Sequence, residues 1–255
     1  MKKIAIIGGG NMGEAIIKGL KRPVMVCESD PLKAKALVKK YKVSIVDVTQ
    51  ASNADIIILA VKPQDMSNAL ALLKTDGQLF ISIAAGLTTA YFEKHLGGKA
   101  RVIRSMPNMP ALIGQGITGI SAGKYAMPQD LKEAQRILNS IGQTIIVKES
   151  MLDAVTAVSG SGPAYVFLFV EQWMAAAEQL GFNEKDAKEL VYKTLLGSAH
   201  LLEQSEFDAG TLRAKVTSKG GTTQAALEVF AKGKFDQLVR KALFAAKDRA
   251  KALAQ

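Results

Sequence analysis

Cysteine is almost absent from this sequence. Cys27 is the single cysteine among 255 residues, and the two histidines, His95 and His200, lie far from it along the chain. One cysteine excludes an internal disulfide framework and fits a reducing compartment. Because no CxxC pair and no Cys/His ligand spacing occurs, the sequence predicts no metal site. We therefore expect a cytoplasmic protein that works without a metal.

Long hydrophobic runs are also missing. The N-terminal lysines precede only about four apolar residues before a glycine cluster, which is too short for the core of a signal peptide. The most apolar segment, 163–180, carries Glu171, Gln172, Glu178 and Gln179, whereas a membrane span needs roughly 20 consecutive apolar positions. We expect no membrane partner. We interpret the segment as a buried helix that a partner subunit helps to cover, and so predict a homo-oligomer.

Aromatic residues are few, at 6% of the sequence, although the formal net charge is +10. Such a basic chain could bind nucleic acid. The lysines are scattered and often stand beside acids, as in NEKDAKEL, and nothing resembles an aromatic RNA platform or an arginine-rich arm. We expect no nucleic-acid partner, and we interpret the charge as a surface that attracts small anionic metabolites.

Short runs of strand-forming residues alternate with helical patterns as far as residue 147. The runs are IAIIG, VMVCE, VSIV, ADIIILAVKP, QLFISIAAG and RVIRSMPN. Strands that alternate with helices predict βαβ units and a parallel sheet. After Glu149 the spacing becomes helical throughout. The sequence therefore predicts an α/β protein, with a Rossmann-type doubly wound domain at 1–150 and an all-α domain at 151–255.

Three glycines near the start have the spacing of a dinucleotide loop. Gly8, Gly10 and Gly13 fit GxGxxG directly after a predicted strand and at the opening of a predicted helix. The first glycine makes a tight turn, the second lets the backbone approach a pyrophosphate, and the third lets the helix pack on the strand. Phosphates then meet the free N–H groups of the helix start. We expect this loop to bind a dinucleotide.

The residue about 20 positions further on should distinguish NAD from NADP, and here it is Glu28. A carboxylate at this place accepts a hydrogen bond from the ribose 2′-hydroxyl of NAD and repels the 2′-phosphate of NADP. Lys33 and Lys35 lie nearby and oppose that effect. We expect NADPH or NADH as the cofactor, with NADH slightly favoured. The alternative is that Glu28 only caps a helix at 31–40.

Three later strand ends are also candidate binding segments, because ligands of open α/β sheets bind beyond the carboxyl ends of the strands. They are AVKP at 60–63, SIAAG at 82–86 and RSMPNMP at 104–110. Small residues at the first two leave room for a ribose or a nicotinamide. Asn108 offers both a donor and an acceptor on a loop that prolines stiffen. Each could equally be an ordinary strand-to-loop turn.

A second glycine-containing stretch, TSKGGTTQAAL at 217–227, precedes an apolar helical stripe. Its glycines and threonines predict a helix start that a threonine hydroxyl can cap. A capped helix start is itself an anion site. The structural and the functional interpretation therefore concern the same atoms.

In order along the chain, the motifs GGGNMGEAI, AVKP, SIAAG, RSMPNMP, SGSGPAYVF and TSKGGTTQAAL resemble those of the pyrroline-5-carboxylate reductase family. The resemblance implies a two-domain enzyme that reduces the C=N bond of 1-pyrroline-5-carboxylate to L-proline with NADPH or NADH. It also implies dimers with interlocked helical domains, and active sites between the cofactor domain and the partner subunit.

The resemblance assigns roles to individual positions. For the cofactor it implies Gly8, Gly9, Gly10, Asn11, Met12, Ala60, Val61, Lys62, Pro63, Ala84, Ala85 and Asn108, to which the loop motif adds Gly13 and Glu28. For the substrate it implies Ser218, Gly221, Thr222, Thr223, Glu149 and Ser161. Many relatives have proline at the position of Lys219 and asparagine near that of Ser44. These departures concern the NADP preference and not the reaction.

Imine reduction needs a held carboxylate and a hydrogen-bond partner for the ring nitrogen. We expect the Thr223 hydroxyl to contact that nitrogen and the N–H groups of 221–223 to hold the carboxylate. Lys62 could instead act like the catalytic lysine of β-hydroxyacid dehydrogenases, but its place in the AVKP turn favours a cofactor or structural role. The competing functions are therefore another Rossmann oxidoreductase of that type, and a non-catalytic nucleotide sensor or nucleic-acid binder.

Overall fold

The computed structural model describes residues 2–253. Contacts divide the chain into two compact units, one formed by residues up to Pro163 together with those from Ala245 onward, and one formed by Ala164–Phe244. We describe each unit by itself.

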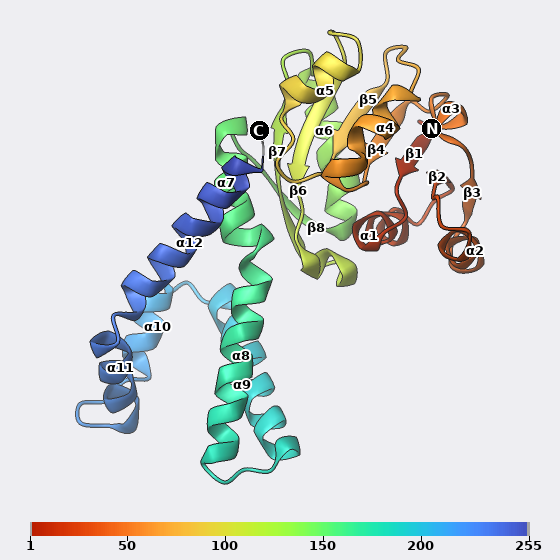
Figure 1. The fold of residues 1–255 in the computed structure, drawn as a ribbon. Helices are drawn as coiled ribbons and strands as arrows, with labels where there is room; N and C mark the ends of the chain where they lie inside the picture. Colours follow the sequence, from red (N-terminus) through yellow and green to blue (C-terminus); the bar gives the residue numbers. More distant parts are fainter. Residues whose placement is uncertain (1, 254–255) are drawn as a thin grey trace. The chain divides into compact units, whose positions relative to one another are not determined.

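The first unit contains a sheet of eight strands within the described residues (Figure 1). The strands are β1 (Ile4–Ile7), β2 (Val24–Cys27), β3 (Val43–Ile45), β4 (Ile56–Leu59), β5 (Leu79–Ser82), β6 (Arg101–Met106), β7 (Gly116–Ala122) and β8 (Gly142–Ile146). Their order is β3-β2-β1-β4-β5-β6-β7-β8, and β1 to β6 are parallel. This part has the order of a Rossmann fold. The predicted doubly wound sheet is therefore confirmed.

The last two strands are additions that the sequence pattern did not predict. β7 runs antiparallel to β6, and β8 runs parallel to β7. Their sequences, GITGISA and GQTII, mix glycine and polar residues with the apolar ones. Such runs lack the continuous apolar character of the central strands β1 and β4, IAII and IIIL.

Helices cover both faces of the sheet. They are α1 (Asn11–Leu20), α2 (Pro31–Lys40), α3 (Val48–Ala51), α4 (Met66–Ala71), α5 (Thr89–His95) and α6 (Pro128–Leu138), with short turns η1 (Pro63–Asp65), η2 (Met109–Ile113) and η3 (Asn139–Ile141). Alternate strand residues enter different cores. Ile6 and Ile58 pack with α1 and α6, whereas Ile7 and Phe80 pack with α4 and α5. This alternation places every strand end at a defined point on the carboxyl edge.

A helical connector follows the sheet. It contains η4 (Glu149–Met151), α7 (Leu152–Val155) and a π-helical turn, η5 (Thr156–Gly160). α7 packs on β7, where a β-carbon at Gly119 would lie 2.8 Å from the Val155 side chain. Glycine at position 119 therefore permits the close approach of the connector to the sheet.

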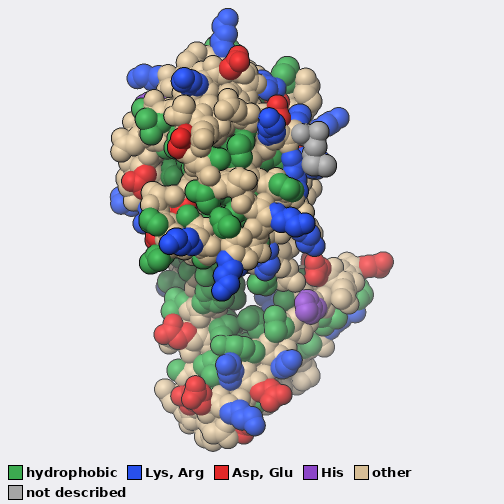
Figure 2. Space-filling model, turned by 90° about the vertical axis from the view of Figure 1, so that its right-hand side faces the viewer, with side chains coloured by type: hydrophobic (Ala, Val, Ile, Leu, Met, Phe, Trp, Pro, Cys, Tyr) green, Lys and Arg blue, Asp and Glu red, His purple; other side chains and the backbone are tan. Residues whose placement is uncertain are grey.

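The remaining helices are α8 (Gly162–Gln179), α9 (Glu184–Gln204), α10 (Ala209–Lys215), α11 (Thr222–Lys232) and α12 (Phe235–Ala252). The second unit has a small core, formed by Ala177, Ala187 and Val191. Large apolar side chains stay open to solvent instead, as Figure 2 shows for one face, and Phe167 and Leu168 of α8 are each 58% exposed. Monomeric proteins rarely expose so much contiguous apolar surface.

The stretch Glu149–Gln179 is long and apolar enough to cross a membrane by length and composition, and little of it is buried. Length and composition alone are weak evidence for a membrane span, because the core helix of a soluble protein can have both. On the face drawn in Figure 2, lysine and arginine side chains are interspersed with acidic ones and do not form one continuous stripe.

Candidate active site

The glycine loop joins β1 to α1 at the carboxyl edge of the sheet. Gly10 is the N-cap residue of α1 and has no side-chain cap bond. The first bond of the helix runs from the Glu14 N–H to the Gly10 carbonyl at 2.8 Å. The N–H groups of Asn11, Met12 and Gly13 therefore have no partner within the helix and point out of its positive end.

Each glycine of this loop is required, or tolerated, for a different physical reason. Gly8 has φ +104°, and a β-carbon there would lie 2.6 Å from the Ala60 carbonyl oxygen. A β-carbon at Gly13 would lie 2.1 Å from the Gly8 carbonyl oxygen, which excludes any side chain. At Gly10 no atom of the described residues, apart from its own chain neighbours, lies within 4 Å of that point. The protein itself thus leaves space beside Gly10, and a pyrophosphate fits that space and the free N–H groups.

Glu28 lies directly beside this loop. Its Oε2 accepts a hydrogen bond from the Gly9 N–H, and its Oε1 accepts one from the Asp30 N–H, both at 2.9 Å. The carboxylate therefore fixes the glycine loop against the turn after β2. Asp30, not Glu28, caps α2, since its side chain accepts from the N–H groups of Leu32 and Lys33. The alternative that Glu28 only caps this helix is wrong.

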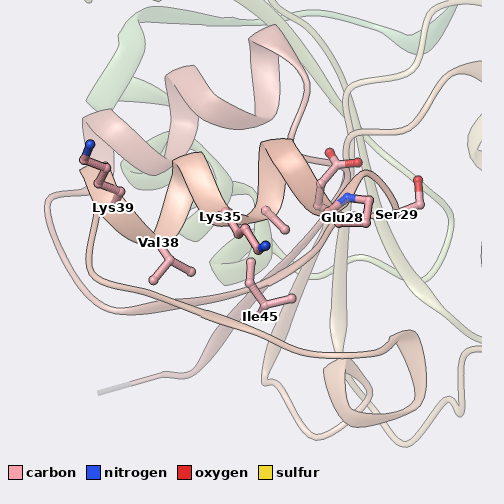
Figure 3. Close-up of a pocket in the computed structure, with 8 residues that line it drawn as sticks. Glu28, Ser29, Lys35, Val38, Lys39 and Ile45 are labelled. Carbon is pink, nitrogen blue, oxygen red and sulfur yellow. The ribbon is translucent and has the colours of Figure 1, made fainter.

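A groove of about 580 Å³ continues from Glu28 along α2 (Figure 3). Its lining includes Ser29, Lys35, Val38 and Ile45. The groove combines an apolar floor with one carboxylate and two lysine ammonium groups, those of Lys35 and Lys39. Its position next to the glycine loop suits the adenosine end of a dinucleotide.

The later strand ends lie next to one another along the same edge. Strand register pairs Ile7 with Leu59, Leu59 with Ser82, and Ser82 with Arg104. The residues that follow, including Ala60, Ala84 and Ala85, therefore come after neighbouring strands. Ala84 is buried, and Ala60 packs against the core. The edge thus gathers the motifs that the sequence singled out.

Asn108 and Lys62 behave differently at this edge. Asn108 is 8% exposed, and its Oδ1 accepts a hydrogen bond from the Ile117 N–H at 2.9 Å, so it ties the loop after β6 to β7. Lys62 is exposed and precedes Pro63 of η1, and it follows Val61 in the turn after β4. Asn108 therefore has a structural task, whereas the Lys62 side chain extends from the edge.

Glu149 and Ser161 belong to the first unit. Both oxygens of Glu149 accept hydrogen bonds from Thr89, from its N–H at 2.6 Å and its hydroxyl at 2.8 Å. The Ser161 N–H donates to the Thr156 carbonyl at 2.8 Å and closes the π-helical turn, a feature frequent at functional sites. Arg104 Nη1 also lies 3.7 Å from Glu149 Oε1. Sequence reasoning did not connect Glu149 with Thr89 or with Arg104, because no local pattern joins these residues.

The remaining predicted substrate residues lie in the second unit, at the start of α11. The N-cap residue is Gly221, without a side-chain cap bond, so the expected capping by a threonine hydroxyl is wrong. The first helical bond runs from the Ala225 N–H to the Gly221 carbonyl at 3.2 Å. The N–H groups of Thr222 and Thr223 are thus without helical partners.

The turn before α11 is tightly built. Gly220 has φ +72°, and its N–H donates to Gln224 Oε1 at 2.8 Å. A β-carbon at Gly221 would lie 2.3 Å from the Ser218 hydroxyl oxygen, so glycine lets that hydroxyl approach the helix start. This helix start repeats the arrangement at Gly10, with a glycine N-cap and free N–H groups, on a scale that suits a small anion.

Comparisons with known proteins identify the family. A family model for pyrroline-5-carboxylate reductase dimerisation matches residues 149–253, and one for NADP oxidoreductase, coenzyme F420-dependent, matches residues 3–86. A pyrroline-5-carboxylate reductase of Mycobacterium tuberculosis is 41% identical over 286 residues, covering 99% of this chain and 97% of the relative. The chain belongs to the pyrroline-5-carboxylate reductase family.

Other members of this reductase family agree. The Pseudomonas aeruginosa enzyme is 38% identical over 266 residues, covering 99% of this chain and 97% of the relative. A pyrroline-5-carboxylate reductase structure from Coxiella burnetii has a TM-score of 0.92 at 37% identity, covering 100% of this chain and 99% of that one. A Plasmodium falciparum pyrroline carboxylate reductase, solved with NADP bound, has a TM-score of 0.89 at 29% identity, with 100% and 98% covered. The predicted resemblance is thereby confirmed.

Proposed function

We propose that this chain reduces the C=N bond of 1-pyrroline-5-carboxylate to L-proline with a nicotinamide dinucleotide. One observation carries the proposal: this member of the reductase family has two helix starts of the same kind. The helix starts at Gly10 and Gly221 both have a glycine N-cap and free N–H groups. One suits a pyrophosphate, and the other suits a small carboxylate.

The dinucleotide would be held by the edge of the first unit. The N–H groups of Asn11 and Met12 would bind its pyrophosphate, and the ends of β4 and β5 at Ala60 and Ala84 would border its ribose and nicotinamide. When the dinucleotide is bound, its reduced nicotinamide supplies the hydride. Lys62 would contact the cofactor and take no part in proton transfer.

The substrate would be held by the start of α11. The N–H groups of Thr222 and Thr223, with the hydroxyl of Ser218, would bind its carboxylate. The Thr223 hydroxyl would form a hydrogen bond with the ring nitrogen as that atom becomes an amine. A protonated imine is already electrophilic, so the residues mainly orient it. The family resemblance implied both Glu149 and Ser161 near the substrate. We keep Ser161 as a proposed neighbour of the substrate, and Glu149 is considered in the next subsection.

The carboxylate of Glu28 supports a slight preference for NADH, because its negative charge lies where an added 2′-phosphate would come. Lys35 in the same groove acts in the opposite direction, which supports use of both dinucleotides. The cofactor class is that of the NADP-type oxidoreductase family, and the preference within it is our proposal.

We also propose a homodimer formed through the helical residues 151–255, in a reducing cytoplasm and without nucleic acid. The exposed apolar side chains of α8 and α9 support the dimer, because a second copy would remove them from water. The match of residues 149–253 to a dimerisation family supports it further. A sedimentation measurement that found only monomers at micromolar concentration would count against the dimer.

The enzymatic proposal is tested by mixing the purified protein with the imine and NADH or NADPH. Loss of the nicotinamide absorbance and formation of proline are expected. A protein that binds the dinucleotide but oxidises only hydroxy acids would instead belong with the β-hydroxyacid dehydrogenases in function.

A further inference from the structure

Glu149 forms a long-range anchor within the first unit. Its Oε1 accepts the Thr89 N–H at 2.6 Å, and its Oε2 accepts the Thr89 hydroxyl at 2.8 Å, across 60 positions of sequence. Thr89 is 4% exposed and is the first residue of α5, so its N–H has no partner within that helix. Hydrogen bonds to an ionised acceptor are the stronger kind. Glu149 therefore completes the start of α5 from a distant part of the chain.

A buried arginine orients the same carboxylate. Arg104, on β6, has a side chain that is 5% exposed, with Nη1 3.7 Å from Glu149 Oε1 and Nη2 3.2 Å from Asp153 Oδ1. A buried guanidinium requires such partners, since an unpaired charge in that place is costly. The anchor thus links the sheet, α5 and the connector at η4 and α7.

The anchor fixes one end of a loop that borders the proposed nicotinamide position. This loop, residues 83–88, joins β5 to α5 and contains Ala84 and Ala85. Its other end is held at Ser82, whose carbonyl accepts a hydrogen bond from the Ser105 hydroxyl at 2.7 Å. Both ends of the 83–88 loop are therefore fastened to neighbouring elements.

We propose that Glu149 is a positioning residue for the cofactor and not a ligand of the substrate. Through Thr89 it fixes the 83–88 loop against the nicotinamide end of the dinucleotide, and so sets the alignment for hydride transfer. This role rests on the proposed function and replaces the expectation that Glu149 touches the imine. Small displacements of a reacting group cost up to about 100-fold in rate.

Two variants release the anchor in different ways. Glu149→Gln keeps the size of the side chain but removes its negative charge, so the bonds to Thr89 lose their ionised acceptor and Arg104 loses an ionised partner. Thr89→Val keeps the shape and removes only the hydroxyl. Thr89→Ser retains both groups and should restore wild-type behaviour. Glu133→Gln is the matched control, because it removes a carboxylate paired with Arg136 on α6, away from the loop.

The expected result is a split between turnover and substrate affinity. Both releasing variants should lower kcat by about 10-fold, leave the KM of the imine within about twofold, and enlarge the deuterium isotope effect of a 4-deuterated dinucleotide. The double variant should lose no more kcat than the more impaired of the two single variants, because the two residues act as one unit. Without any imine, the fluorescence of bound NADH should change in both variants and stay unchanged in Glu133→Gln.

Other outcomes overturn the proposal. A KM of the imine that rises about 10-fold with kcat preserved would make Glu149 a substrate ligand. A lower melting temperature with unchanged kinetics and unchanged NADH fluorescence would make the anchor structural only. If Glu149→Gln fails to fold, Thr89→Val carries the test alone. Failure of the proposed function itself looks different, because the wild-type protein would then oxidise no dinucleotide with the imine.

Discussion

The carbonyl oxygen of Gly8 lies 2.1 Å from the point where a β-carbon of Gly13 would stand. A methyl group at position 13 therefore has to push α1 away from the glycine loop. We expect Gly13→Ala to lower the free energy of unfolding by about 1–3 kcal/mol, as overpacking does. Denaturant titration measures this change.

Gly10→Ala is the matched comparison. Within residues 2–253 no atom beyond its chain neighbours lies within 4 Å of its β-carbon position, and its φ of −68° suits any residue. Its stability should change by less than about 0.5 kcal/mol, while the dissociation constant of the dinucleotide rises about 10-fold. Equal dinucleotide affinity in Gly10→Ala and the wild type would remove the pyrophosphate from this loop.

Thr223→Ala tests the contact with the ring nitrogen. Loss of one hydrogen bond that matters during reduction should lower kcat by about 10-fold and leave the melting temperature nearly unchanged. The Thr223 hydroxyl makes no cap bond in α11, so its removal does not disturb the helix start. Thr223→Ser should keep most of the activity. Wild-type turnover in Thr223→Ala would exclude the hydroxyl from the chemistry.

Glu28→Gln tests the choice of dinucleotide. Removal of the negative charge should raise the ratio of kcat/KM for NADPH over NADH by about 10-fold. Because one of the two backbone N–H groups loses its acceptor, stability should also fall by about 1 kcal/mol. Lys35→Met, in the same groove, should shift the ratio in the opposite direction. An unchanged ratio in both variants would show that this groove does not sense the 2′-phosphate.

The thiol of Cys27 should be unreactive in the folded protein. Burial, together with the negative charge of Asp47, raises its pKa to about 11. Since the folded pKa lies above the ordinary value, the thiolate fraction at pH 8 is only about one in a thousand. Labelling with a thiol reagent should be slow at pH 8 and fast in denaturant. Rapid labelling of the native protein would mean that the end of β2 opens readily.

The sequence predicted the elements whose pattern is local. The six runs of strand-forming residues become β1 to β6, and GxGxxG becomes a loop in which Gly8, Gly10 and Gly13 each have a distinct steric reason. The strands β7 and β8 escaped because their glycines and polar residues weaken the apolar signal. The place of β7 depends on pairing with β6 and that of β8 on pairing with β7, and only the tertiary structure defines these pairs.

Long-range contacts explain the differences at the site. From the sequence, Glu28 was interpreted only as a ribose ligand or a helix cap. In the structure its carboxylate accepts hydrogen bonds from two backbone N–H groups. Glu149 lies 60 positions from Thr89, so no spacing rule could join them. The cap of α11 was assigned to threonine by propensity, whereas the chain uses Gly221 because the Ser218 hydroxyl occupies the place of a side chain.

The most direct test of the central claim follows a deuterium atom. The protein is incubated with 1-pyrroline-5-carboxylate and a dinucleotide that carries deuterium at the transferable position, and the product is examined by mass spectrometry and NMR. The account predicts L-proline with one deuterium on the carbon that was double-bonded to nitrogen, in equal amount to the dinucleotide oxidised. Dinucleotide oxidation without labelled proline, or no oxidation at all, would contradict it.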